Sequence, residues 1–369
     1  MTLKLRFDAK QGAALTAGTT VAELLSRSWR RNAPCLKMPR KRLAQVVPLL
    51  LRTGSAALGW LRVRDSDLAD FPEARELEAG YRQHAMEAVI HELQIQDVFR
   101  RMRAAGIEPL LLKGWAVARL YPNSEFRPYG DIDLWVSPRQ SKAATAALRS
   151  SAEGDVYCVE IHSSFYKQYE RTLDDVLLRS QLVSLGEVPI RVACLEDHLR
   201  FLCLHFLGHG AWRALWLCDI ALAVESRAPD FDWDRCLNGS PRFADWIACT
   251  IGLAHQLLGA EVKGTPMEKR AKNLPRWLVP AVLRQWAAGA GMSGVEDFTF
   301  SLTRNLSHPA RLIGALRDHW RNPIQATIET RGAFGRSPRM PYQIAAVLLR
   351  IPGLTGELLS RQRVEVSEL

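Results

Sequence analysis

The stretch Gly130-Asp131-Ile132-Asp133-Leu134-Trp135-Val136 places two carboxylates two residues apart inside an apolar run. Alternate residues of a β-strand point to the same face, so we expect Asp131 and Asp133 to project together while the apolar residues enter the core. Two like charges side by side are unfavourable unless a cation neutralises them. Mg²⁺, held by oxygen ligands and shared with substrate phosphates, is the usual such cation. The pattern therefore indicates phosphoryl or nucleotidyl transfer.

A second motif, Leu110-Leu111-Leu112-Lys113-Gly114, lies shortly before this stretch. It predicts a strand that ends at Lys113 and Gly114, with a helix after it. The N-terminus of a helix offers free N–H groups and partial positive charge to a phosphate. Gly114 would let the backbone approach closely, and Lys113 could neutralise a phosphate oxygen. Alone, the pair also fits an ordinary turn between a strand and a helix.

The run Val159-Glu160-Ile161-His162 predicts another strand, in which Glu160 and His162 share one face. Glu160 could complete a metal site and accept the proton of an attacking hydroxyl. An exposed glutamate on a strand is the alternative interpretation.

The composition limits the class of protein. The chain has 369 residues, of which 47% are hydrophobic, which indicates a globular protein of about two domains. Its net charge of +10 favours anionic partners, among which nucleic acid is possible but not favoured. Seven cysteines without a C-x-x-C pair argue for a reducing compartment. The chain shows neither a signal-peptide pattern nor an apolar run long enough to span a bilayer, so we expect a cytoplasmic protein with no membrane partner.

Hydrophobic spacing outlines the remaining elements. It predicts strands over 108–113, 131–136 and 157–165, two more within 182–193, and helices over 20–31, 72–105, 115–121, 138–150 and 172–179. The segment 43–63 is apolar but interrupted by Pro48 and Gly54. Residues 195–259 are predicted to be helical, followed by a basic helical tail. In the helix over 72–105, the apolar positions are Met86, Val89, Ile90, Leu93, Val98 and Met102.

Taken together, these motifs resemble the polymerase-β-type nucleotidyltransferase superfamily. The resemblance is carried by Leu112-Lys113-Gly114, Tyr121-Pro122, the run 127–134 (RPYGDIDL) and Val159-Glu160-Ile161-His162. More narrowly, the chain resembles the bacterial group of uncharacterised nucleotidyltransferases, whose pattern reads LKG…Y…R…GDIDLLV…DLHW. Segments 199–210 and 213–219 resemble the helical region of that group, so the resemblance covers about residues 85–260. Trp115 and Glu160 depart from the superfamily, which usually has a small or hydroxyl residue and an aspartate there.

The resemblance implies an α+β fold: a small mixed sheet with flanking helices, and mostly helical N- and C-terminal regions. We expect an N-terminal helical region over 1–84, a catalytic core over 85–195, and a helical C-terminal domain with a basic tail over 196–369. The implied catalytic residues and metal ligands are Asp131, Asp133 and Glu160. The implied nucleotide-binding residues are Lys113, Gly114, Arg127 and Gly130, and residues that could line the cleft are His162, His205 and His209.

The implied activity is transfer of a nucleoside monophosphate from an NTP, with ATP as the expected nucleotide, to an acceptor hydroxyl with release of pyrophosphate. Mg²⁺ or Mn²⁺ would be the cofactor, and the acceptor could be a small molecule, a peptide, a protein or a tRNA end. An anionic or peptidic acceptor could bind a basic surface formed by Arg304, Arg311, Arg317 and Arg321. The alternative is a nucleotide-binding interaction module, such as an antitoxin-type partner with little turnover. Three carboxylates in one place favour the enzyme.

A zinc site is a further alternative, because His198, His205 and His209 are spaced as residues on one helix could be. No glutamate follows in the H-E-x-x-H pattern. Core or cleft-lining histidines are the favoured interpretation.

Overall fold

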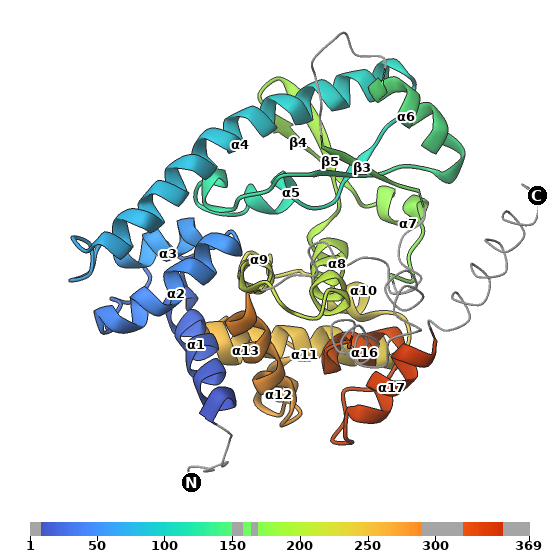
Figure 1. Ribbon diagram of the computed structural model, residues 1–369. Coiled ribbons are helices and arrows are strands. Elements are labelled where there is room, and N and C mark those ends of the chain that lie inside the picture. Colours follow the sequence, from blue (N-terminus) through green and yellow to red (C-terminus); the bar gives the residue numbers. More distant parts are fainter. Residues whose placement is uncertain (1–8, 150–157, 164–168, 290–319, 350–369) are drawn as a thin grey trace, which may run out of the picture.

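The computed structural model describes residues 9–149, 158–163, 169–289 and 320–349 of the chain (Figure 1). These residues form one small mixed sheet and many helices, so the predicted α+β class is confirmed. Positions 304, 311 and 317 of the predicted basic surface lie outside the described residues, and Arg321 forms an ion pair with Glu329. In the described part of the chain, no helix has both the length and the apolar character needed to cross a membrane.

The sheet has five strands in the order β3-β2-β1-β5-β4. Their bounds are Leu110–Leu111 for β1, Ile132–Trp135 for β2, Val159–His162 for β3, Gln181–Leu185 for β4 and Val188–Val192 for β5. The β2/β3 and β1/β5 pairs are parallel, and the β1/β2 and β4/β5 pairs are antiparallel. Every residue of β2 is buried: the apolar residues enter the core as predicted, and Asp133, which was expected to project towards a cleft, is buried as well. The two strands predicted within 182–193 are confirmed as β4 and β5.

Helix α4 (Pro72–Ala104) runs along the sheet, and α6 (Ser141–Arg149) lies near the C-terminal end of α4 (Figure 1). Pro72 occupies the first turn, where its missing N–H is not needed. Gly106, at φ +74°, follows the helix end, so the predicted helix is confirmed. Val98 and Met102 are buried against the sheet, together with side chains of β1, β2 and β5. The other four predicted apolar positions of this helix are exposed.

The N-terminal and C-terminal helices share a second hydrophobic core. Its N-terminal helices are α1 (Ala9–Leu25), α2 (Arg40–Arg52) and α3 (Ala56–Val63). Its larger C-terminal helices are α8 (Leu195–Gly208), α9 (Ala214–Glu225), α11 (Pro241–Leu258) and α13 (Leu278–Ala288). Shorter helices complete this half: α7 (Leu173–Leu177), α10 (Trp233–Leu237), α12 (Glu268–Lys272), α16 (Pro323–Glu329) and α17 (Met340–Leu348). The site described below lies between this helical half and the sheet.

Several predicted boundaries were wrong. The first helix runs over Ala9–Leu25 and not over 20–31. Pro48 lies inside α2 without ending it, whereas Gly54 separates α2 from α3 at φ +69°. The helix predicted over 115–121 is the short α5 (Trp115–Ala118). The helix predicted over 138–150 begins as a 3₁₀ turn, Pro138–Gln140, before α6. Local spacing marks where elements form, but their ends depend on contacts that it does not contain.

Candidate active site

A cavity of about 440 Å³ lies where the sheet faces helices α4, α8 and α9. It gathers residues that are far apart in the sequence. All but one of the predicted site residues line it: Lys113, Gly114, Arg127, Gly130, Asp131, Glu160, His162, His205 and His209. The exception, Asp133, is 1% exposed and lies just behind this wall on β2.

Asp133 is the most constrained carboxylate of the site. Its Oδ1 lies 2.7 Å from Nζ of Lys113 and 2.9 Å from Nε2 of His162. Burial raises the pKa of Asp133, but the hydrogen bond with His162 and the charge of Lys113 outweigh burial and hold this pKa below its ordinary value. The other oxygen, Oδ2, is buried without a hydrogen-bond partner. Buried carboxylate oxygens normally have partners, so Oδ2 is available to a ligand such as a cation.

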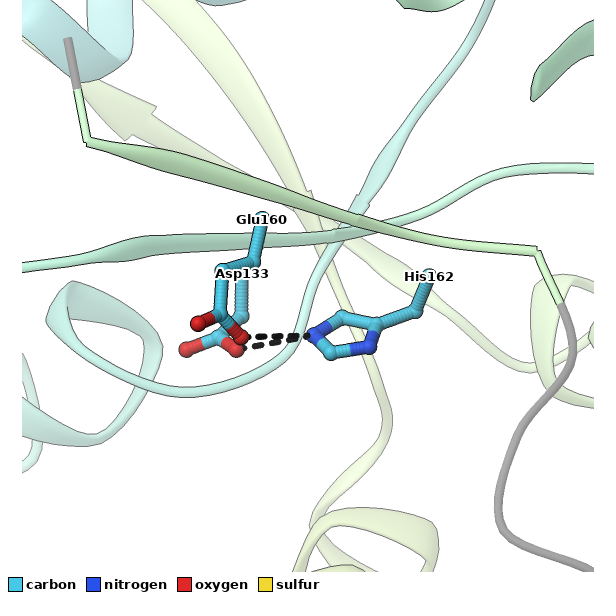
Figure 2. A group of neighbouring side chains, drawn as sticks. All are labelled: Asp133, Glu160 and His162. Atoms are coloured by element: carbon cyan, nitrogen blue, oxygen red, sulfur yellow. Dashed lines mark hydrogen bonds and ion pairs between the residues drawn. The ribbon is translucent and has the colours of Figure 1, made fainter. Parts of the chain in front are cut away.

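Asp133, Glu160 and His162 form a compact group of possible metal ligands (Figure 2). The parallel register places Asp133 beside Glu160, and His162 follows two residues later on the same face of β3. One ligand atom from each residue lies within 4.8 Å of the others. Glu160 Oε2 is 3.6 Å from His162 Nε2, and the Glu160 side chain is 57% exposed. Within the described residues, no other three His, Cys, Asp or Glu side chains are grouped this closely.

Asp131, which the sequence predicts to be a metal ligand together with Asp133 and Glu160, lies apart from the group of three. It precedes β2, is half-buried and lines the cavity, but it is not a member of the group of three. His162, predicted only as a cleft residue, is the third member of that group. The two carboxylates suit Mg²⁺ or Mn²⁺, whereas an imidazole is a ligand more typical of transition metals than of Mg²⁺. The zinc alternative is not supported, because His198, His205 and His209 do not form such a group in the described chain.

The turn at Gly114 is shaped for a glycine. Its φ of +58° lies in the left-handed region, and a Cβ would meet the Tyr129 ring at 3.3 Å. Trp115, the bulky residue that departs from the superfamily pattern, is 5% exposed and packs into the core next to the sheet. It therefore leaves the cavity side of the turn open. Because α5 has only four residues, Lys113 and the glycine backbone contribute more to this corner than a helix dipole does.

Arg127 lines the cavity, but its guanidinium is bound to a residue that the sequence did not single out. Its Nη2 donates to Oδ2 of Asp219 at 2.9 Å, and its Nε lies within 3.3 Å of both carboxylate oxygens. The Tyr121 hydroxyl donates to the same carboxylate at 2.9 Å. This buried network fastens the loop before β2 to α9. Two motif residues, Tyr121 and Arg127, thereby hold the site in place.

The helical wall of the cavity is aromatic and cationic. His205 is 8% exposed, both its ring nitrogens lack a hydrogen-bond partner, and its ring centroid is 4.5 Å from that of Trp216. Burial lowers the pKa of His205 well below its ordinary value and so favours the neutral form of the ring. Arg213, which was missed at the sequence level, donates from Nε to the carbonyl of Thr53 at 2.7 Å. Burial lowers its pKa to about 10, and its only sequence signal was its place in the segment 213–219.

Comparison with known families identifies one family that the chain resembles. The chain matches the family described as uncharacterised nucleotidyltransferase over residues 44–154 and again over 149–259. No curated protein and no solved structure matches the chain. The two matches run from residue 44 to residue 259, which is more than half of the 369 residues and includes the cavity, the Asp133 group and the Arg127–Asp219 network. The chain belongs to the uncharacterised nucleotidyltransferase family.

Proposed function

We propose that this protein transfers a nucleoside monophosphate from an NTP, with ATP as the expected nucleotide, to an acceptor hydroxyl and releases pyrophosphate. The observation that carries the proposal is the unpartnered Oδ2 of Asp133, buried beside Lys113, Glu160 and His162 at the cavity. Family membership makes nucleotidyl transfer the general activity. The cation, the leaving group and the acceptor class belong to the proposal.

A divalent ion fits the donors that are present. Asp133 and Glu160 would hold it, with Asp131 on the cavity wall and His162 beside them as further ligands. Mg²⁺ or Mn²⁺ bound there would neutralise phosphate charge and orient the reacting oxygens. Such an ion would provide a partner for the buried Oδ2 of Asp133. Clustered buried charge is costly in free energy, and a module that only binds another protein would gain nothing from it.

The residues of the chain itself have separate tasks in this proposal. Lys113 is close enough to Asp133 to be neutralised by it and can also pair with a triphosphate oxygen in the cavity. Glu160, with its exposed carboxylate, takes the proton of the acceptor hydroxyl. The acceptor oxygen then bonds to the α-phosphorus, the bond from that phosphorus to the bridging oxygen breaks, and pyrophosphate leaves. Gly114 and Gly130 keep the backbone near the phosphates free of side chains.

The first test measures nucleotide binding by isothermal titration with and without MgCl₂ or MnCl₂. We expect the metal to strengthen ATP binding by the wild-type protein, and Asp133→Asn to abolish that gain. Asp230→Asn, which changes an exposed aspartate away from the cavity, is the matched control and should behave like wild type. Equal metal dependence in all three proteins would rule out the assignment.

The second test measures turnover as pyrophosphate release from NTPs in the presence of candidate acceptors. Once an acceptor is found, Glu160→Gln should lower kcat more than it raises KM, because Glu160 acts on the attacking group. Tight metal-dependent nucleotide binding with no release for any acceptor would favour the interaction module over the enzyme.

A further inference from the structure

The outer face of α4 is apolar and open to solvent. Met86, Val89, Ile90 and Leu93 are 72%, 61%, 54% and 63% exposed. They lie at positions i, i+3, i+4 and i+7, so they form one continuous stripe on the helix. The stripe points away from the face of α4 that packs on the sheet, since residues such as Val98 and Met102 lie on the other side of the helix. Contiguous exposed apolar surfaces of this kind mark interaction sites more often than single exposed residues do.

The stripe is arranged symmetrically about its own centre. Val89 and Ile90 flank the midpoint, and Met86 and Leu93 lie at equal distances from it on either side. Arg82 lies four residues before Met86, and Asp97 lies four residues after Leu93. Both are therefore on the same face of the helix as the stripe. If a second copy of the helix is laid antiparallel on this face, each residue meets its mirror position: Val89 opposite Ile90, Met86 opposite Leu93 and Arg82 opposite Asp97.

The charges at the ends of the stripe are complementary in that alignment. Within one chain, Arg82 pairs with Glu78 and Arg101 pairs with Asp97, each four residues apart. The antiparallel alignment places Arg82 opposite Asp97, and Glu78 opposite Arg101, so four charges of alternating sign meet at each end. A parallel alignment would instead oppose Arg82 to Arg82 and Asp97 to Asp97. Charges flanking an apolar seam select partner and direction in paired helices.

We propose that α4 pairs with α4 of a second copy of this chain, antiparallel, about a two-fold axis between Val89 and Ile90. A two-fold interface requires a self-complementary surface, which the mirrored stripe provides. The seam would span roughly 30 Å of helix. A contact of one helix per subunit is small, so the dimer should dissociate on dilution. This inference does not depend on the transferase activity, because neither the Asp133 group nor Lys113 takes part in it.

The first experiment is sedimentation velocity of the full chain over a wide concentration range. We expect wild type to change from monomer to dimer as concentration rises, and Ile90→Asp to remain monomeric at concentrations where wild type is dimeric. Leu178→Asp, at a leucine that is 85% exposed away from α4, should dimerise like wild type. Circular dichroism should be unchanged in both variants, because both side chains are at the surface. A monomeric wild type, or a dimer that Ile90→Asp does not weaken, would overturn the proposal.

The second experiment tests direction by exchanging charges. Arg82→Asp alone and Asp97→Arg alone each oppose like charges across the seam and should weaken dimerisation about tenfold. Mixing these two variants restores both opposite-charge contacts in the heterodimer, as does combining both changes in one chain. Lys142→Asp, at an exposed lysine on α6, controls for the change in net charge. Failure of the mixture and of the double variant to recover would show that Arg82 and Asp97 do not face each other, and would overturn the antiparallel pairing.

Discussion

The ammonium group of Lys113 lies 2.7 Å from Oδ1 of Asp133, and together they join the end of the glycine turn to the centre of β2. The lysine is 18% exposed at its side chain, so one side of the pair faces the cavity and the other faces the core. The same carboxylate is the buried member of the proposed metal group. A divalent cation bound there would therefore compete with Lys113 for one negative charge.

This competition predicts opposite effects of one substitution. Lys113→Met, which keeps the length of the side chain and removes its charge, should strengthen Mn²⁺ binding several-fold because Asp133 loses its competing cation. The same change should weaken ATP binding and reduce its dependence on salt, because a phosphate partner is lost. Titrations of Mn²⁺ and of ATP measure both effects, with Lys142→Met as a surface control. If both affinities fell together, Lys113 would be supporting the metal site and not competing for it.

The buried network around Asp219 predicts a large loss of stability on truncation. Asp219→Ala would leave Arg127 as an unpaired buried charge, which costs about 3–5 kcal/mol in the free energy of unfolding. Tyr121→Phe removes one hydrogen bond to the same carboxylate and should cost about 1 kcal/mol. Urea denaturation compares the two variants. Losses of similar size would mean that the ion pair contributes no more than the hydroxyl does.

The two glycines of the site should respond differently to an added methyl group. Gly114→Ala forces a left-handed backbone on alanine and should cost about 1–3 kcal/mol of stability. Gly130→Ala should leave stability nearly unchanged, because a Cβ there meets nothing within 4 Å and its φ is not positive. If Gly130 borders bound phosphate as proposed, its alanine variant should still bind ATP more weakly. Thermal unfolding and ATP titration on both variants separate the two effects.

Acid should destabilise the fold through His198. Burial, followed by the charge of Arg119, lowers the pKa of His198 to about 3, whereas an unfolded histidine titrates near 6.5. As pH falls below about 6.5, the unfolded chain takes up a proton that the folded chain excludes, so the free energy of unfolding decreases by about 1.4 kcal/mol per pH unit. The difference in unfolding free energy between pH 7 and pH 5 should shrink by about 2 kcal/mol in His198→Asn. An unchanged difference would show that His198 is protonated in the folded protein.

The strands that carry the candidate site were predicted correctly, because local patterns encode them. The alternation around Asp133 and Glu160 indicated two strands, and the parallel register then brought the two carboxylates side by side. Asp219 could not be predicted in the same way. Its partners Tyr121 and Arg127 are more than 90 positions earlier, and nothing near it in the sequence specifies that contact.

The same limit applies to α4. Its apolar spacing predicted the helix, but spacing does not say which apolar face is buried. Val98 and Met102 enter the core, while Met86 and Ile90 remain at the surface. A helix with apolar residues on two faces can pack against a different partner on each face. Only the three-dimensional structure shows which face packs against the sheet.

The position of β3 at the end of the sheet order has a thermodynamic consequence. Asp133 sits on a strand held from both sides, whereas Glu160 and His162 sit on a strand whose described pairing is with β2. An ion bound by these residues would link β2, which is paired on both sides, to the outer strand β3. Whatever free energy the ion gains on binding would then also oppose local opening of β3. Backbone amides of β3 should accordingly exchange with solvent more slowly when Mn²⁺ is present, and those of β4, at the opposite end, should not. Binding of the ion and local ordering of β3 would thus be thermodynamically coupled.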